Sequence, residues 1–296
     1  MSAPSISVVI PTYNGGERPR RCLKAVFAQT VPPAEVIVVD DGSTEPLAWL
    51  AEEAARRPSL QVLRQENAGP AAARNRGWRA ASGEVVAFTD DDCLPTPSWL
   101  AELGAAFAEQ PEAPAVYGRI IATGERSPLA HYVENDGGEH QTANAAFRRE
   151  VLERLGGFDE AFRYPYLEDT ELFYRLSELG EPAFAAGAVV EHPVRPGTLR
   201  GRLRRVDYYA ADYLLYAKHP ERYRARRNGC RPLVHLLYYL GLKHGLATAL
   251  REFPWLFRRP LEYLTLLAAL ILERALLAWR LLTGRLQRSA REAGAR

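Results

Sequence analysis

The chain has 296 residues and a formal net charge of +2, and its fractions of 47% apolar and 25% charged residues are ordinary for a soluble protein. This length allows one large domain or two small ones. The three cysteines, Cys22, Cys93 and Cys230, follow neither a disulfide nor a zinc spacing, which favours a reducing compartment. The N-terminus has no basic segment and no cleavage site, so we expect no signal peptide.

The net charge hides an asymmetry between two parts of the chain. Residues 1–194 carry 17 Lys/Arg and 29 Asp/Glu, whereas residues 195–296 carry 21 Lys/Arg and 7 Asp/Glu. Such a split indicates two regions with different partners. We therefore expect an acidic domain at 1–195, which needs a cation at its site, and a basic helical region at 196–296, which suits an anionic surface.

Up to residue 109, apolar runs typical of strands alternate with helical spacings. The predicted strands are 5–10, 36–39, 60–63 and 84–88. The predicted helices are 20–29, 46–57, 71–81 and 97–109. This alternation predicts a Rossmann-like α/β fold, with a mainly parallel sheet and helices on both faces.

From residue 113 the pattern is looser. Strands are predicted at 116–123 and 183–190, and helices that end at glycines at 148–155 and 167–179. The polar, glycine-containing stretch 124–142 is expected to be a mobile loop over a site.

Beyond residue 196 the sequence predicts helices with arginine-rich faces, including two apolar stretches at 233–250 and 261–282. Charged residues interrupt both. The longest uncharged run of the second stretch, 263–272, is about half of the roughly 20 residues that a membrane-spanning helix needs. We therefore expect these helices to lie in a membrane interface, or to pack on each other, rather than to cross a bilayer.

Polar clusters follow three of the predicted strands, at 11–14, 40–43 and 90–92, and a fourth cluster, Glu168-Asp169, opens a predicted helix. Because the carboxyl ends of parallel strands meet at one edge of a sheet, we expect the first three clusters to form a single site. The adjacent carboxylates of Asp90, Asp91 and Asp92 repel one another unless a cation neutralises them. A hard divalent ion with oxygen ligands is the commonest cation for this purpose.

No glycine-rich phosphate loop follows the first strand. If the ligand carries phosphates, their charge must therefore be neutralised in another way. A carboxylate after the second strand can accept hydrogen bonds from a ribose or a base. A metal on the triple aspartate would neutralise phosphates. Together with a separate carboxylate, these groups predict a displacement in which a nucleoside diphosphate leaves.

Six motifs occur in a fixed order along the first two-thirds of the chain. They are SVVIPTYN (7–14), VVDDGST (38–44), NAGPAAARNRG (67–77), FTDDD (88–92), GGFDE (156–160) and EDTEL (168–172). In this combination the chain resembles the family 2 glycosyltransferases with the GT-A fold. The resemblance covers roughly residues 5–192.

The resemblance implies a donor pocket for a nucleotide-sugar. Asp40 or Asp41 would contact the base or ribose, and Arg74 would reach the base or the pyrophosphate. The floor of the pocket would be formed by Pro11, Thr12 and Tyr13. We expect a UDP-sugar first, with GDP- and dTDP-sugars as alternatives.

The resemblance also assigns the metal and the base. Asp92 would bind Mg²⁺ or Mn²⁺, and Asp90 would lie near the ribose or the metal. Asp91, the middle residue of the Asp-x-Asp motif, would border the donor or only face solvent. His192 matches a place where some relatives supply a further metal or phosphate contact. Asp169 matches the catalytic base, with Glu168 beside it.

Contacts with the acceptor are implied for Trp99, Gly157 and Phe158. Structural interpretations stay open here: Trp99 fits a core position, Gly157 a helix stop, and His192 a structural histidine before a proline. In the same way, Asp40-Asp41-Gly42 fits a turn, and Glu168-Asp169 fits the negative charge that a helix N-terminus favours.

The activity implied by the resemblance is an inverting, metal-dependent transfer of a sugar to an acceptor hydroxyl, in cell-surface polysaccharide or glycolipid synthesis. Asp169 would take the hydroxyl proton, the metal would stabilise the departing diphosphate, and the transition state would resemble an oxocarbenium ion. One alternative is a nucleotidyltransferase that makes nucleotide-sugars, which would usually carry a basic, glycine-rich loop after the first strand. Another is a non-catalytic sugar-binding module, which is expected to lack Asp92 or Asp169.

For residues 196–296, attachment to an anionic membrane surface is the favoured interpretation, and packing within the chain or an oligomer is the second. Nucleic-acid binding is not expected, because the apolar content is high and no aromatic-basic module is present. The protein is then expected in the cytoplasm, peripheral on the inner face of the membrane, with a glycan or lipid-linked acceptor.

Overall fold

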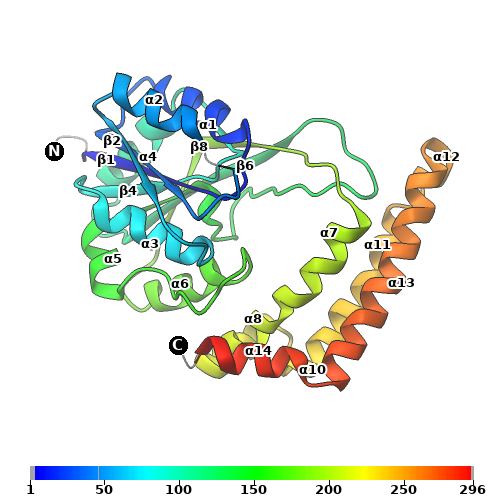
Figure 1. The fold of residues 1–296 in the computed structure, drawn as a ribbon. Coiled ribbons are helices and arrows are strands. Elements are labelled where there is room, and N and C mark those ends of the chain that lie inside the picture. Colours follow the sequence, from blue (N-terminus) through cyan, green and yellow to red (C-terminus); the bar gives the residue numbers. More distant parts are fainter. Residues whose placement is uncertain (1–3, 46, 295–296) are drawn as a thin grey trace. The chain divides into compact units, whose positions relative to one another are not determined.

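A computed structural model describes residues 4–45 and 47–294 of the chain, without the side chains of residues 239–242 (Figure 1). These residues form two compact units. The first comprises the chain up to Thr123 together with Val133–Pro193. The second comprises Gly124–Tyr132 and the chain from Val194 onward.

A sheet of eight strands forms the centre of the first unit. Its strands are β1 (Ile6–Thr12), β2 (Glu35–Asp40), β3 (Leu60–Arg64), β4 (Val85–Phe88), β5 (Leu94–Pro95), β6 (Ala115–Thr123), β7 (Ala145–Arg148) and β8 (Ala183–Pro193). They lie in the order β3-β2-β1-β4-β7-β6-β8-β5.

The pairing of the strands determines which of their ends meet. β1 is parallel to β2 and β4, β2 to β3, and β6 to β8. β7 is antiparallel to both β4 and β6, and β5 is antiparallel to β8. Since β7 reverses the direction twice, β6 and β8 point the same way as β4. The carboxyl ends of β1, β2, β4 and β8 therefore open on one edge of the sheet.

Helices cover both faces of this sheet (Figure 1). One face carries α1 (Arg18–Phe27), α2 (Ala48–Arg56) and α4 (Trp99–Glu109), and the other carries α3 (Pro70–Ala80), α5 (Arg149–Leu155) and α6 (Glu168–Leu176). Along β1, Val8 and Ile10 pack towards the first group, and Val9 packs towards the second. A strand that is buried on both faces has apolar side chains at successive positions, which is why β1 is a continuous apolar run in the sequence.

The second unit is helical. It contains α7 (Leu199–Arg204), the 3-10 helix η2 (Arg205–Tyr209), α8 (Ala210–Lys218), α9 (Pro220–Arg226), α10 (Pro232–Val234), the π-helix η3 (His235–His244), α11 (Gly245–Arg251), α12 (Trp255–Arg258), α13 (Pro260–Leu282) and α14 (Arg285–Gly294). Two small apolar clusters lie along α13, one around Leu277 and Leu281 and one around Tyr263, Leu266 and Leu270. Within residues 4–45 and 47–294, no helix combines the length and the apolar character that a membrane span requires.

The predicted fold class is confirmed, including the mainly parallel sheet, the helices on both of its faces and the helical C-terminal region. Two strands were not predicted. β5 has only two residues, and β7 is made of Ala145, Ala146, Phe147 and Arg148, of which only the phenylalanine has a high strand propensity.

Some predicted boundaries differ from the structure. Pro46, where the second helix was predicted to begin, lies outside the described residues, and α2 begins at Ala48. The stretch 233–250 is not one helix but contains α10, η3 and α11. The stretch 124–142 is divided between the two units, and Asn135 within it forms a β-bridge with Ile120.

Candidate functional site

The loop after β1 is joined to the triple aspartate through Asp91. Thr12, the last residue of β1, donates a hydrogen bond from Oγ1 to Asp91 Oδ2 over 2.6 Å. Arg18 at the start of α1 lies 3.5 Å from the same oxygen. Asp91 is only 7% exposed, so the expectation that it faces solvent is wrong. Its carboxylate holds the first turn of the site in place.

The loop after β2 is held by its own two carboxylates, both of which are buried. Asp40 accepts a hydrogen bond from the backbone amide of Ser43 and pairs with Arg64, each over 2.9 Å. Asp41 accepts four hydrogen bonds from the segment that leads into α3, donated by Gln65 Nε2, Asn67 Nδ2, Ala68 N and Gly69 N. The predicted turn is therefore present, and both carboxylates stabilise it.

The two loops also contact each other. Ser43 Oγ accepts a hydrogen bond from the backbone amide of Asn14 over 2.9 Å, and Asn14 Oδ1 accepts one from the amide of Thr44 over the same distance. Between these anchored residues, Tyr13 remains 47% exposed. Its ring is available to a ligand at the edge of the sheet.

Arg74 on α3 connects two of the predicted clusters. Its Nη2 lies 2.9 Å from Asp90 Oδ1, and its Nη1 lies 2.9 Å from Glu168 Oε1. The arginine is buried, and its guanidinium lies 5.7 Å from the ring centre of Phe158. One side chain thus brings the carboxylate after β4 and the first residue of α6 to the same place.

The electrostatics of this cluster place a proton on one carboxylate near neutral pH. Burial and the neighbouring Asp169 raise the pKa of Glu168 to about 7, and Arg74 offsets only part of this effect. Burial alone would lower the pKa of Arg74, but Asp90 and Glu168 outweigh it and raise that pKa. The two directions are consistent, because a single guanidinium charge is shared among three carboxylates.

A group of metal-ligating side chains lies beside this cluster. Ligand atoms of Asp92, Cys93 and His192 lie within 4.8 Å of one another, and all three residues are buried. Asp92 Oδ2 and His192 Nε2 are 3.7 Å apart. The histidine comes from β8, whose end opens on the same edge as that of β4. The structure thus brings together the two residues for which a shared metal was expected.

The donor set of this group fits a divalent cation such as Mn²⁺. Carboxylate oxygens suit Mg²⁺ and Mn²⁺, and an imidazole nitrogen is accepted by the later metals. Burial and the charge of Asp90 raise the pKa of Cys93 well above its ordinary value, so its thiol stays protonated. Oxygen and imidazole donors suit such an ion better than a thiol does, so Asp92 and His192 would be the ligands.

The residues expected to touch an acceptor lie in the core. Trp99 is fully buried, and its Nε1 donates to Asn144 Oδ1 over 2.8 Å. Phe158 is 3% exposed and packs edge to face on Phe88, with ring centres 5.3 Å apart. Neither side chain has surface to offer an acceptor, so the structural interpretation of Trp99 holds.

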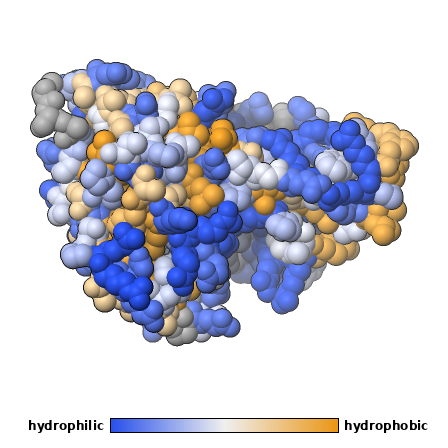
Figure 2. Space-filling model, turned by 90° about the horizontal axis from the view of Figure 1, so that it is seen from above, coloured by the Kyte–Doolittle hydropathy of each residue, from blue (hydrophilic) through white to orange (hydrophobic). Residues whose placement is uncertain are grey.

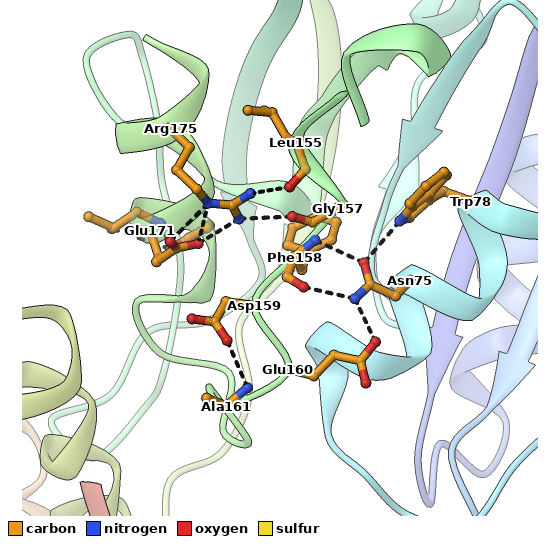
Figure 3. A network of polar contacts seen from close by, with 12 residues as sticks. Asn75, Trp78, Leu155, Gly157, Phe158, Asp159, Glu160, Ala161, Glu171 and Arg175 are labelled. Carbon is orange, nitrogen blue, oxygen red and sulfur yellow. Dashed lines mark hydrogen bonds and ion pairs between the residues drawn. The ribbon is translucent and has the colours of Figure 1, made fainter. Parts of the chain in front are cut away.

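Gly157 is at a crowded joint rather than at a surface (Figure 3). Its φ of +78° is in the left-handed region, and a Cβ atom there would overlap Asn75 Oδ1 and the indole of Trp78. Its carbonyl accepts a hydrogen bond from Arg175 Nη2 over 2.8 Å, and the carbonyl of Leu155 accepts one from Nη1 over 2.7 Å. Arg175 therefore fastens the end of α5 to α6.

Asn75 is a structural residue that the sequence analysis did not single out. Its Nδ2 donates to Phe158 O over 2.8 Å and to Glu160 Oε1 over 2.7 Å. Its Oδ1 accepts from Phe158 N over 2.8 Å and from Trp78 Nε1 over 2.9 Å (Figure 3). An asparagine inside a helix and directly after Arg74 was the available signal, since this residue type is unfavourable there without such a purpose.

Comparisons with known proteins show the family of the chain. The profile of glycosyl transferase family 2 matches residues 7–165. The pre-mycofactocin glycosyltransferase of Mycobacterium tuberculosis is 31% identical over 245 residues, which is 75% of this chain and 50% of that protein. The matched part of the chain spans half or less of the length of the curated relatives that it resembles.

Two solved structures share the fold. The mannosyltransferase PcManGT from Pyrobaculum calidifontis, in complex with GDP-Man and Mn²⁺, has a TM-score of 0.58 and 26% identity over 99% of this chain and 88% of that one. S. aureus TarS 1-349 in complex with UDP-GlcNAc has a TM-score of 0.58 and 18% identity, over 98% of this chain and 89% of that one.

Proposed function

The chain belongs to glycosyl transferase family 2, and we propose that it is an inverting, metal-dependent enzyme that moves a sugar from a nucleotide-diphosphate sugar to an acceptor hydroxyl. One observation carries the proposal: Arg74 lies 2.9 Å from both Asp90 and Glu168, at the same sheet edge as the buried Asp92–His192 pair. The complex of PcManGT with GDP-Man and Mn²⁺ supports this class of donor and metal. The family match also argues against the nucleotidyltransferase alternative.

In this proposal the donor lies along the carboxyl ends of β1, β2 and β4. The exposed ring of Tyr13 covers the base, above a floor made by Pro11 and Thr12. Asp40 or Asp41 accepts a hydrogen bond from the base or ribose. Asp91 holds the floor of the pocket in position through its hydrogen bond with Thr12. Because the protein itself already bonds these carboxylates, the pocket is organised before the donor enters, which lowers the entropic cost of binding.

Asp92 and His192 would hold the divalent ion. When bound, that ion supplies positive charge to the departing diphosphate. Asp90 is the more exposed neighbour, with 32% of its side chain accessible, and its second oxygen can reach the ribose while Arg74 holds the first. Arg74 also contributes a buried positive charge close to where the pyrophosphate would lie.

Asp169 is the better candidate for the catalytic base. It is half-buried, whereas Glu168 is 3% exposed and bound to Arg74. As the acceptor oxygen attacks C1 of the sugar, its proton passes to the Asp169 carboxylate. The bond between C1 and the diphosphate oxygen breaks on the opposite face, so the configuration at C1 is inverted.

The expected acceptor is a glycan or a lipid-linked sugar in cell-surface polysaccharide or glycolipid synthesis. The protein would lie on the cytoplasmic face of a membrane, and the second unit rather than the donor site would attach it there.

The experiment is a thermal-shift screen of UDP-, GDP- and dTDP-sugars with and without Mn²⁺ or Mg²⁺. A ligand present at 100 times its dissociation constant adds about 2.7 kcal/mol to the stability. We expect one nucleotide class to stabilise the wild type only with metal, and Asp92→Asn to remove that metal dependence. Asp136→Asn is the matched control, because Asp136 is exposed and pairs with Arg119 at the surface. Equal stabilisation with and without metal in the wild type would contradict the metal role.

A further inference from the structure

Exposed apolar side chains are concentrated in the second unit. Among the described residues, 18 large hydrophobic side chains are exposed, and 14 of them lie between Leu233 and Leu282. Figure 2 shows the corresponding hydrophobic surface at the end of the helical unit that α11, α12 and α13 form. A soluble monomer rarely leaves so many large apolar residues together in contact with water, so this surface calls for a partner.

The helix α13 is apolar on two opposite faces. Its inner face, with Leu266, Leu270, Leu277 and Leu281, is buried in the two clusters of the unit. Its outer apolar residues fall within about 100° of one another on a helical projection. They are Leu261, Leu264, Ile271, Leu272, Trp279 and Leu282. The outer stripe carries no charge along a helix that is about 34 Å long.

A second stripe precedes it in α11 and α12. Leu246, Leu250, Phe253 and Phe257 are spaced by four, three and four residues, and their exposed fractions run from 47% to 78%. Phe253 lies in the turn between α11 and α12, and its ring packs edge to face on that of Phe257, with ring centres 5.7 Å apart. The two stripes belong to packed elements, since α12 and α11 both contact α13.

Arginines border the apolar residues. Arg251 and Arg258 are exposed beside the stripe of α11 and α12, and Arg285 and Arg288 are exposed just beyond the end of the α13 stripe. The guanidinium of Arg285 lies 4.4 Å from the ring centre of Trp279. Tryptophan with arginine at the edge of an apolar face is the composition of helices that lie in a membrane interface.

We infer that these two stripes, the outer face of α13 and the exposed side of α11 and α12, enter the acyl-chain boundary of an anionic bilayer while the flanking arginines bind its headgroups. The charge favours lipid over a second copy of this chain, because residues 195–296 carry 21 Lys/Arg against 7 Asp/Glu, and two such faces would repel each other. Attachment to an anionic bilayer rests on the membrane location given in the proposed function. The residues that support it all lie in the second unit, outside the donor site.

The test is co-flotation of the full chain with vesicles of phosphatidylcholine alone and of phosphatidylcholine mixed with phosphatidylglycerol. The variant Phe257→Gln/Leu261→Gln/Leu282→Gln alters the three most exposed apolar side chains of the unit, which are 78%, 79% and 88% exposed and contribute little to folding. We expect the wild type to bind the anionic vesicles, more weakly at high salt, and the triple variant to bind at least about 100-fold more weakly. The control Val31→Gln/Phe184→Gln removes exposed apolar side chains from the first unit and should bind like the wild type.

Three results would overturn the inference: no binding of the wild type to anionic vesicles, equal binding of the triple variant, or equal binding to vesicles without phosphatidylglycerol. A wild-type dimer without lipid that becomes monomeric in the triple variant would assign the surface to a second copy instead. Nucleotide-sugar binding measured on the same samples separates the two proposals, because loss of vesicle binding with intact donor binding leaves the glycosyltransferase assignment standing.

Discussion

Replacing Glu168 by glutamine should stabilise the protein at alkaline pH, although it removes a buried ion pair with Arg74. The folded-state pKa of Glu168 is about 7, whereas a glutamate in an unfolded chain has a pKa of about 4.3. Between these two values the folded protein binds more protons than the unfolded chain. The free energy of unfolding must therefore fall as the pH rises through this window, and it stays constant above it.

The size of the fall follows from the difference between the two pKa values. Each unit corresponds to 1.36 kcal/mol, so ionisation of Glu168 costs the folded state about 3 kcal/mol at pH 8 relative to pH 4. Glutamine resembles the protonated acid and does not titrate. The variant should match the wild type near pH 4 and exceed its stability by about 3 kcal/mol near pH 8.

The assay is urea denaturation of both proteins at several pH values, with the difference in free energy of unfolding plotted against pH. Asp169→Asn is a second test variant. Removing that neighbouring charge should lower the pKa of Glu168, so the free energy of unfolding should decrease less between pH 4 and pH 8. Glu160→Gln, at a half-exposed carboxylate, is the control and should leave the wild-type slope unchanged. A Glu168→Gln protein that is less stable than the wild type near pH 8 would refute the reasoning, since attraction to Arg74 would then outweigh burial and repulsion.

Two further changes test the base and the joint of the site. Asp169→Asn should lower the rate of sugar transfer by about 10²- to 10⁴-fold while the donor affinity measured by calorimetry stays the same, and turnover near the wild-type rate would exclude Asp169 as the base. Gly157→Ala should lower the free energy of unfolding by more than about 1 kcal/mol, because the left-handed backbone and the overlap with Asn75 both oppose a side chain. Gly138→Ala is its control: the φ of Gly138 is also positive, at +90°, but no atom lies within 4 Å of its added Cβ, so an equal loss in both variants would mean that crowding at Gly157 is unimportant.

The parallel half of the fold could be predicted because its strands are buried on both faces. Residues 36–39 are apolar without interruption, and the strand ends at Asp40, whose buried carboxylate pairs with Arg64. The polar clusters of the candidate site could be predicted for the same reason, because charged residues in such a sheet are tolerated where a strand ends. The antiparallel β7 gave no such signal, because alanine favours helices and is depleted in strands, so its pairing with β4 is decided by tertiary contacts.

Within the site, the sequence could identify the polar residues but not their partners. The family resemblance separated Asp92, expected at a metal with His192, from Asp91, but the hydrogen bond from Thr12 to Asp91 was not predicted. The aromatic residues Trp99 and Phe158 fit both a sugar platform and a core by composition, and only their burial decides between these roles. Partner choice and burial depend on long-range packing, which local patterns do not encode.

The four hydrogen bonds of Asn75 mean that deamidation of its side chain would disturb the site. Deamidation would turn Nδ2, which donates to Phe158 O and Glu160 Oε1, into a second carboxylate oxygen. Two attractive contacts would become repulsive in a buried place, and the added charge would lie one residue from Arg74. A single slow hydrolysis, without any change in the gene, would thus weaken the attachment of α3 to the segment that carries Phe158.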